Sequence, residues 1–187
     1  MNAARRASLL LTVLVACAAL APSCARAGKP RGVNQAGWGS PMVTPTVLTA
    51  RTYIEADLAT VWEQFTRAEA YAAWSSAPCL EFGDDPGEPA VWGTHEQVVY
   101  RGEITRFENG SALGYTFRFE DAGCDEPPTP VDVRFEAAGP VVLVQVRHDC
   151  SGARQTAETI GALGWQKSLS RLKTLLETGT AMPWPED

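Results

Sequence analysis

The sequence predicts an α+β fold in which an antiparallel sheet of about six or seven strands packs against a long C-terminal helix. Three observations lead to this prediction. Strand-like segments follow one another without intervening helices, which is typical of an α+β chain rather than of a parallel βαβ sheet. Apolar and polar residues alternate within those segments. Residues 157–177 instead have helical spacing, and their apolar stripe consists of Trp165, Leu169, Leu172 and Leu176.

The first elements are one strand and two short helices. Residues 47–55, VLTARTYIE, are rich in β-branched side chains and predict a strand. Asp57 is a suitable N-cap for the helix LATVWEQFT, whose apolar residues fall at helical spacing. The segment RAEAYAAW then predicts a second helix that ends at Trp74, and residues 83–90 form a loop rich in Gly, Asp and Pro.

A series of antiparallel strands follows. THEQVVYRGEITRF can hold two strands, with a turn or bulge near 101–102. Residues 108–111 predict a hairpin turn, because Asn-Gly tolerates positive φ at both central positions. VDVRFE and VVLVQVRH alternate as far as His148. LGYTFRFE also alternates, and its apolar side consists of Leu113, Tyr115, Phe117 and Phe119.

The N-terminus has the pattern of an exported bacterial protein. We expect a signal peptide over residues 1–27, a flexible leader over 28–44, one domain over 45–178 and an irregular tail over 179–187. Two early arginines, a short apolar run and an Ala-Arg-Ala cleavage site support secretion or periplasmic localisation, with no transmembrane segment in the mature form. Leu-Val-Ala-Cys, ending at Cys17, also matches a lipobox, so a membrane-anchored lipoprotein is the alternative.

The charge balance excludes an ordinary nucleic-acid-binding protein. The formal net charge is −6, and removal of Arg5, Arg6 and Arg26 with the signal peptide would make it −9. A domain this acidic, with no basic run in its sequence, is repelled by nucleic acids and by anionic lipid surfaces.

Three cysteines remain after that cleavage: Cys79, Cys124 and Cys150. In an oxidising compartment we expect one disulfide and one free thiol. Cys124 and Cys150 lie at the ends of predicted strands and are the candidate pair. Their spacing matches no zinc site, and only His95 and His148 could complement them, so neither a metal nor a cofactor is expected.

Nucleophilic catalysis has little support in the sequence. There is no Gly-x-Ser-x-Gly elbow, and residues 75–76, both Ser, lie in a predicted loop without a nearby histidine. The cysteines fit no Cys-His signature, and the glycines of GVNQAGWG lack the flanking strand and helix of a dinucleotide site. An enzymatic role is left open, and a binding role is favoured.

Four stretches together resemble the START-like (SRPBCC) superfamily, also called the helix-grip fold. They are IEADLATVWEQFTRAEAYAAW, YRGEITRFENGSALGYTFRF, VDVRFEAAGPVVLVQVRHDC and GWQKSLSRLKTLLE, and they span about residues 45–178. The most similar branch is named for the C-terminal domain of the activator of the 90-kDa heat-shock-protein ATPase. Three features depart from that branch: EPAVWGTHEQ replaces its Gly-Gly-rich strand, DAGCDEPPTP contains a cysteine, and an export signal precedes a mostly cytosolic domain type.

The resemblance implies a cavity between sheet and helix that holds a small hydrophobic molecule. The candidate ligand-binding residues are Trp74, Tyr100, Tyr115, Phe117, His148, Trp165 and Leu169. The alternative for each aromatic residue is ordinary core packing, although buried tyrosine hydroxyls would still need partners. The 90-kDa chaperone is not expected as a partner, because an exported protein would not meet a cytosolic ATPase.

His148 is the candidate acid or base. Alternation places it on the apolar side of its strand, where a titratable group could orient a ligand or transfer a proton. The alternative is a strand-end histidine bonded to solvent or to Asp149. Glu103 is a second titratable candidate, and the simpler interpretation is a solvated charge on the outer face.

Three functional hypotheses follow. The first is an exported carrier or binding protein for a small apolar molecule, without turnover. The second is an enzyme similar to polyketide cyclases or dehydratases, with His148 as acid or base. The third is a module that binds another protein of the cell envelope.

Overall fold

The computed structural model describes residues 46–120, 125–161 and 163–185. All described residues belong to one compact unit, Ser40–Asp187. The expected signal peptide, the leader and Cys17 therefore lie outside the described residues. Within the part that is described, no helix has the length and apolar character needed to cross a membrane.

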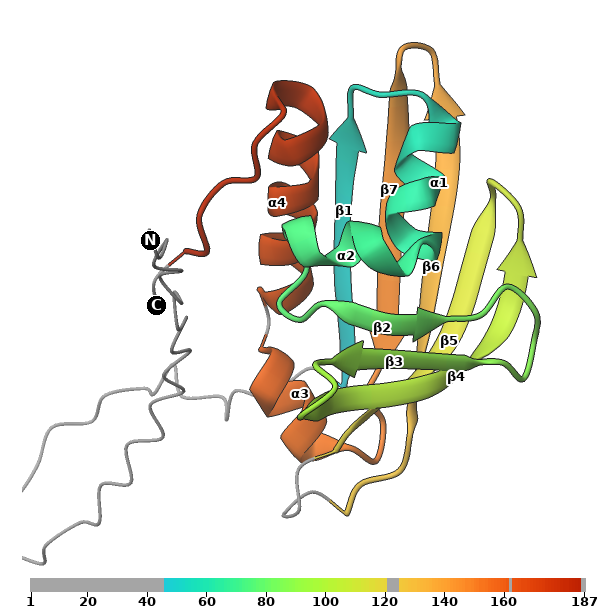
Figure 1. Ribbon diagram of the computed structural model, residues 1–187, viewed down its shortest axis with the longest axis vertical. Helices are drawn as coiled ribbons and strands as arrows, with labels where there is room; N and C mark the ends of the chain where they lie inside the picture. The colour runs from blue at the N-terminus through green and yellow to red at the C-terminus, as the bar shows by residue number, and fades with distance from the viewer. Residues whose placement is uncertain (1–45, 121–124, 162, 186–187) are drawn as a thin grey trace, which may run out of the picture. The chain divides into compact units, whose positions relative to one another are not determined.

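Seven strands form one sheet. They are β1 (Val47–Ile54), β2 (Cys79–Phe82), β3 (Pro89–Gly93), β4 (Val98–Glu108), β5 (Ala112–Phe119), β6 (Thr129–Ala138) and β7 (Val141–Asp149). Their order is β1-β7-β6-β5-β4-β3-β2, and every neighbouring pair is antiparallel. In Figure 1, β2, β3 and β4 cross the direction of β1, β7 and β6, which shows how strongly the sheet curves. The predicted fold class and number of strands are confirmed.

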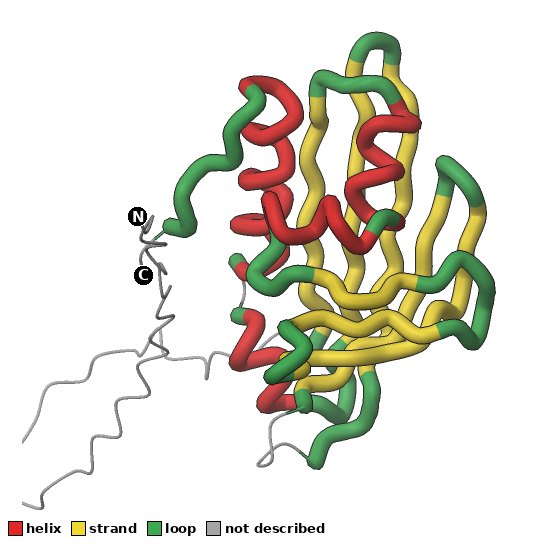
Figure 2. Tube along the Cα trace, viewed as in Figure 1, coloured by secondary structure: helices red, strands yellow, loops and turns green. Residues whose placement is uncertain are grey.

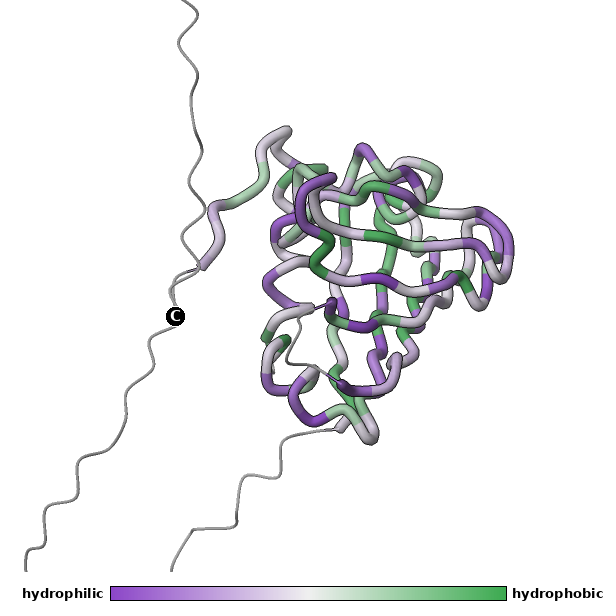
Figure 3. The backbone as a smooth tube through the Cα atoms, turned by 60° about the horizontal axis from the view of Figure 1, so that its bottom comes forward, coloured by the Kyte–Doolittle hydropathy of each residue, from purple (hydrophilic) through white to green (hydrophobic). Residues whose placement is uncertain are grey.

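Alternation places the core on one face of this sheet. Val131, Val133 and Phe135 of β6 are buried, whereas Arg134 between them is exposed. Figure 3 shows the same alternation of hydrophilic and hydrophobic residues along the strands. A shift of one residue in the pairing would turn this buried set toward solvent, so the apolar pattern itself fixes the register.

Four helices occur among the described residues: α1 (Leu58–Thr66), α2 (Ala68–Trp74), α3 (Arg154–Ile160) and α4 (Gly164–Thr178). Figure 2 shows them in red beside the yellow strands. Asp57 caps α1 as predicted, because its carboxylate accepts a hydrogen bond of 2.8 Å from the Thr60 N–H. The buried residues of α1 are Val61, Trp62 and Phe65, three of the four apolar residues that the helical spacing selects.

The prediction of two strands in THEQVVYRGEITRF is wrong. β4 is one strand from Val98 to Glu108, with a register shift between Ile104 and Arg106. Gly102 does not turn the chain. It allows close approach of β5 instead, since a Cβ atom there would lie 1.6 Å from the carbonyl oxygen of Thr116. The strand that precedes β4 is β3, Pro89–Gly93, which ends before this segment begins.

The hairpin turn between β4 and β5 is at its predicted place. Ser111 N donates to Glu108 O over 2.9 Å, and Gly110 has a φ of 72°. Asn109 does not have positive φ, so only one central residue adopts the left-handed region. The expectation of positive φ at both positions is therefore wrong.

The C-terminal helical segment is divided, where the sequence predicted one helix over 157–177. α3 ends at Ile160, because the next residue, Gly161, has a φ of 68° that breaks the helix, and α4 begins at Gly164. The N-terminus of α3 is held by Glu126, whose carboxylate accepts hydrogen bonds from the backbone N–H groups of Gln155 and Thr156. The predicted stripe of α4 is confirmed, with Leu169 and Leu172 fully buried and Trp165 and Leu176 half-buried against the core.

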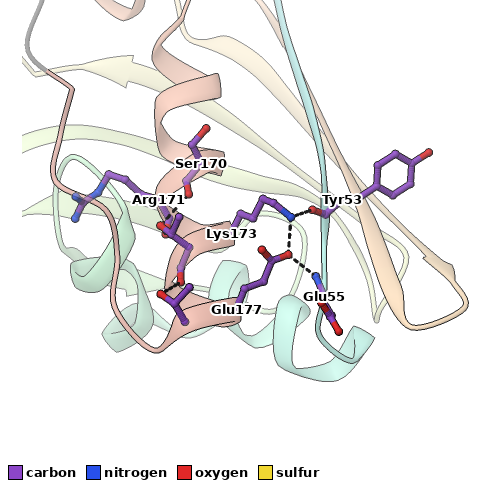
Figure 4. A network of polar contacts seen from close by, with 8 residues as sticks. Tyr53, Glu55, Ser170, Arg171, Lys173 and Glu177 are labelled. Atoms are coloured by element: carbon purple, nitrogen blue, oxygen red, sulfur yellow. Dashed lines mark hydrogen bonds and ion pairs between the residues drawn. The ribbon is translucent and has the colours of Figure 1, made fainter.

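α4 lies along β1, an edge of the sheet (Figure 1). Figure 4 shows how two of its side chains complete that edge. Lys173 Nζ donates to the carbonyl oxygen of Tyr53 over 2.7 Å, and Glu177 Oε1 accepts from the N–H of Glu55 over 2.8 Å. α4 thus satisfies backbone groups that an edge strand leaves open.

Arg171 joins α4 to α2. Its guanidinium donates to the carbonyl oxygens of Ala73 and Trp74, each over 3.2 Å, at the C-terminal end of α2. It also donates to Met182 O and lies 4.7 Å from the ring centroid of Trp184. A cation is favoured at a helix C-terminus, so one side chain holds α2 and the following segment against α4.

Candidate functional site

The predicted lining residues lie together in the core between the sheet and the helices. Trp74 ends α2, Tyr115 and Phe117 come from β5, and Leu169 comes from α4. All four are buried within one apolar cluster, and half-buried Tyr100 of β4 packs against it. The sequence therefore identified residues that meet in space, and their role in ligand binding stays a prediction.

The aromatic side chains of this region form a continuous group, here called the aromatic cluster. Its members are Tyr71, Trp74, Phe82, Trp92, Tyr100, Tyr115 and Phe117. Trp92 is at its centre, with ring centroids 5.0 Å from Tyr100, 5.3 Å from Tyr115 and 5.8 Å from Tyr71. These separations are typical of direct aromatic contact. The rings pack on one another between α2 and strands β2 to β5.

Trp92, Tyr71 and Phe82 were not predicted as site residues. Trp92 lies in EPAVWGTHEQ, the stretch that departs from the family pattern. Its alternation with Ala90, which is also fully buried, was the available signal that both residues face the core. Trp92 fills space that a glycine-rich strand would leave open.

Two buried indole groups of the aromatic cluster lack a hydrogen-bond acceptor. Among the described residues, no acceptor bonds to Nε1 of Trp74 or to Nε1 of Trp92, and each side chain is 1% exposed. A buried donor without a partner costs about 1–3 kcal/mol. Tyr71 shows the usual arrangement, since its hydroxyl donates to Phe65 O over 2.8 Å.

The tyrosines of the aromatic cluster remain neutral hydrogen-bonding groups. Burial raises the pKa of Tyr71 and Tyr115 well above the ordinary value, and burial also raises the pKa of Tyr100. The interior therefore offers apolar rings and neutral N–H or O–H groups. This chemistry suits an uncharged molecule with few polar atoms.

His148 has no exposed surface and makes hydrogen bonds through both ring nitrogens. Nε1 of Trp165 on α4 donates to Nδ1 over 3.2 Å, and Nε2 lies 2.7 Å from Oγ1 of Thr129 on β6. The Thr129 hydroxyl in turn donates to Phe117 O over 3.0 Å. A chain of hydrogen bonds therefore runs from α4 through β7 and β6 to β5.

This arrangement determines the tautomer of His148. Nδ1 accepts a hydrogen bond from Trp165, so the proton of the neutral ring is on Nε2, which donates to Thr129. Burial lowers the pKa of His148 to about 4. The ring is neutral at physiological pH, and its lone pair is already used. The expectation of a bond to solvent or to Asp149 is wrong, because the two partners are Trp165 and Thr129.

Glu103 is exposed on β4, in agreement with the simpler interpretation of a charge on the outer face.

Cys124 of the predicted disulfide lies outside the described residues, and the pairing stays a prediction. Cys150 is buried and forms no disulfide with another described residue, and burial raises the pKa of its thiol to about 11. Cys79 is likewise buried, with its pKa raised to about 12 by burial. Neither thiol is activated as a nucleophile.

Three acidic side chains in the loop between β2 and β3 approach one another: Asp84, Asp85 and Glu88. All three are exposed. Glu88 accepts hydrogen bonds from the backbone N–H groups of Asp84 and Asp85, which accounts for the arrangement as a feature of the loop.

The sequence model of one protein family matches most of the folded domain. The family is described as Activator of Hsp90 ATPase homolog 1-like protein, and the match covers residues 55–177. A search of the curated proteins finds no match to this sequence.

Solved structures share the fold at low sequence identity. DynU16, a protein in the dynemicin biosynthetic locus, is 19% identical with a TM-score of 0.61, over 73% of this chain and 49% of that one, so the chain spans about half of its length. CV1439 from Chromobacterium violaceum is 21% identical with a TM-score of 0.60, over 71% and 98% of the two chains. The Aha1 dimer from Colwellia psychrerythraea is 15% identical with a TM-score of 0.57, over 71% and 97%. At these identities the likeness shows a common fold alone.

Proposed function

The chain belongs to the family of Activator of Hsp90 ATPase homolog 1-like proteins, and on this premise we propose that it binds a small hydrophobic molecule between its sheet and its helices. The fold supports either hydrophobic-ligand binding or a cyclase-like function. The chemistry of the interior favours binding without turnover.

The observation that carries this proposal is the pair of unpartnered indole N–H groups in the aromatic cluster. Trp74 and Trp92 are both buried, and both contact the ring of Tyr71. Their unpaired donors would be satisfied by a ligand that carries a carbonyl or ether oxygen on an apolar body. Entry requires a gap between α2 and the sheet. α2 has only seven residues, and Arg171 holds its end through two hydrogen bonds.

The surroundings of His148 argue against acid or base catalysis at this residue. A general base needs a free lone pair within hydrogen-bond reach of the substrate. In His148 that lone pair accepts from Trp165, and the single proton of the ring is donated to Thr129. The residue is better suited to joining α4 to the sheet than to proton transfer.

We also propose that the protein acts outside the cytoplasm. The N-terminal pattern of a signal peptide supports this proposal. Cleavage after residue 27 would release a soluble binding protein, whereas acylation of Cys17 would tether the same domain to a membrane.

Ligand extraction tests the proposal directly. Protein purified from its own host is analysed by native mass spectrometry and by organic extraction, and we expect one co-purifying apolar compound. Thermal shift is then measured with fatty acids, sterols and a matched aromatic pair, fluorenone and fluorene, which differ in one carbonyl group. Fluorenone should raise the Tm more than fluorene does, because only the ketone can accept from an indole N–H.

Substitutions test whether the larger Tm shift with fluorenone depends on the buried indole groups. The double variant Trp74→Phe/Trp92→Phe should abolish the difference between ketone and hydrocarbon, whereas Trp184→Phe, at a half-exposed indole in the C-terminal segment, should preserve it. The proposal fails if nothing co-purifies and no compound of the panel shifts the Tm.

A further inference from the structure

A hollow of about 550 Å³ lies on the outer face of the sheet, over β1, β6 and β7. Its volume falls within the range of small-molecule sites. The polar side chains of its lining are Thr49, Arg51, Asp132, Arg134, Gln145, Arg147 and Gln166. Gln166 is on α4, so the hollow reaches the edge of the sheet where that helix begins.

Strand register brings three arginines from distant parts of the sequence to this hollow. Arg51 of β1 and Arg134 of β6 both pair with Gln145 of β7, one on each side. Adjacent strands are about 4.8 Å apart, so the two Cα atoms are separated by roughly 10 Å. Arg147 follows two residues after Gln145 on the same face, about 7 Å along the strand. Guanidinium groups at these separations can reach a common small ligand.

Within the described part of the chain, two of the three arginines of the hollow, Arg51 and Arg134, lack the ion pairs that other arginines on this face make. On β4 and β5, Arg101 and Arg118 pair with Glu120 at 3.2 and 2.8 Å. Similarly, Arg106 pairs with Glu108 at 2.7 Å.

In the hollow, Arg147 pairs with Asp149 at 2.8 Å. Among the described residues, no carboxylate lies within ion-pair distance of Arg51 or Arg134. Two of the three arginines in the hollow therefore have no carboxylate of the described chain in direct contact.

Asp132 is the carboxylate among the residues that line the hollow. It also faces an arginine outside the hollow, Arg106 of β4. Gly114 separates Asp132 from Arg106 across β5, and the side chains of Thr105 and Arg106 lie over this glycine. The pKa of Arg106 is raised mainly by its hydrogen bonds to Glu108 and further by the charge of Asp132. Asp132 thus forms the rim of the hollow toward β4, and the arginines and glutamines form the rest.

We propose that this hollow binds a small oxyanion with two or more negative charges, of the phosphoryl or polycarboxylate class. Arg51 and Arg134 supply charged donors on opposite sides, and Gln145 and Gln166 supply neutral amide donors. A planar guanidinium matches phosphate and carboxylate oxygens with two parallel hydrogen bonds. The site is on the opposite face of the sheet from the aromatic cluster and does not depend on the proposed hydrophobic ligand.

The test is a titration of the full chain with inorganic pyrophosphate and, in a second arm, with citrate, at constant ionic strength. Binding is measured by isothermal calorimetry and by ¹⁵N chemical-shift changes. We expect saturable binding with shifts confined to β1, β6, β7 and the start of α4. The double variant Arg51→Gln/Arg134→Gln should weaken binding by at least roughly tenfold per guanidinium, the value of one charge-assisted hydrogen bond.

Arg101→Gln is the matched control, because it removes the same charge from the same face outside the hollow. It should change the dissociation constant by less than about twofold, as expected for a distant screened charge. Equal weakening by the control and by the double variant would overturn the proposal, since it would indicate only general attraction. Absence of saturable binding in both arms would also overturn it. The Tm of each variant confirms that these exposed substitutions leave the fold intact.

Discussion

The indole of Trp165 donates a hydrogen bond of 3.2 Å to Nδ1 of His148, and this bond joins the start of α4 to the last strand of the sheet. The histidine is fully buried, and its second nitrogen bonds to Thr129. Because the bond from Trp165 requires an unprotonated Nδ1, the packing of α4 and the protonation state of His148 are linked.

Removal of this donor should destabilise the domain. Trp165→Phe keeps an aromatic ring and leaves Nδ1 of His148 buried without a donor. We expect the free energy of unfolding to fall by about 1–3 kcal/mol, measured by urea denaturation at neutral pH. Trp184→Phe, in the partly exposed C-terminal segment, should change it by less than about 0.5 kcal/mol. Equal effects of the two substitutions would contradict the structural role of the bond.

His148 should make stability depend on pH in a defined window. Burial lowers its pKa from 6.5 to about 4, so folding favours the neutral ring. The contribution of His148 to the free energy of unfolding is therefore complete above pH 6.5, and it is lost as the pH falls through 6.5 toward 4. The loss amounts to about 3 kcal/mol.

The variant His148→Gln isolates this contribution. It cannot titrate, so its stability should fall less steeply over the same pH range, while the carboxylates contribute equally to both proteins. Denaturation curves at a series of pH values give the difference. Parallel pH profiles for wild type and variant would show that His148 does not titrate differently on folding.

Gly102 should not tolerate a side chain. A Cβ atom at this position would lie 1.6 Å from the carbonyl oxygen of Thr116, which belongs to the backbone and cannot rotate away. We expect Gly102→Ala to cost about 2–4 kcal/mol of stability, because β4 and β5 must separate locally. Circular dichroism melting curves would measure the loss.

Gly139 provides the comparison for this substitution. It has a φ of 65° with open space around it, so Gly139→Ala should cost only the strain of a left-handed residue, about 1–2 kcal/mol. A milder effect at Gly102 than at Gly139 would contradict the close approach of the two strands.

Lys173 should protect β1, the edge strand of the sheet, from pairing with another molecule. It bonds to Tyr53 O and to Glu177, which itself accepts from the Glu55 N–H (Figure 4). Lys173→Met should lower stability by about 1 kcal/mol and increase self-association through β1, as seen by light scattering. Arg67→Met, between α1 and α2, removes an exposed ion pair with Glu63 at 3.7 Å and should leave both properties unchanged. Unaltered scattering by the Lys173 variant would indicate that other contacts protect β1.

Features that depend on near neighbours could be predicted from the sequence. The cap at Asp57, the turn at Gly110 and the alternation of β5 and β6 all follow from local backbone preferences and from the period of the apolar pattern. These signals were sufficient for the fold class, and the stripe of α4 identified Leu169 as a core residue.

Features that depend on distant partners were decided by the tertiary structure. The sequence suggested a turn at Gly102 and one helix through Gly161, because the approach of Thr116 and the left-handed break are not visible in periodicity. The partners of His148 come from β6 and α4, 19 residues before it and 17 after it. No short window of sequence could pair them.

The same reason applies to the two candidate ligand sites. The sequence identified aromatic residues that share a core, but the unpaired donors of Trp74 and Trp92 emerge only when every nearby acceptor is placed. It showed no basic run, because Arg51, Arg134 and Arg147 come from three strands and meet only through strand pairing. Local chemistry therefore determined which elements form, and the register between distant strands determined which side chains meet.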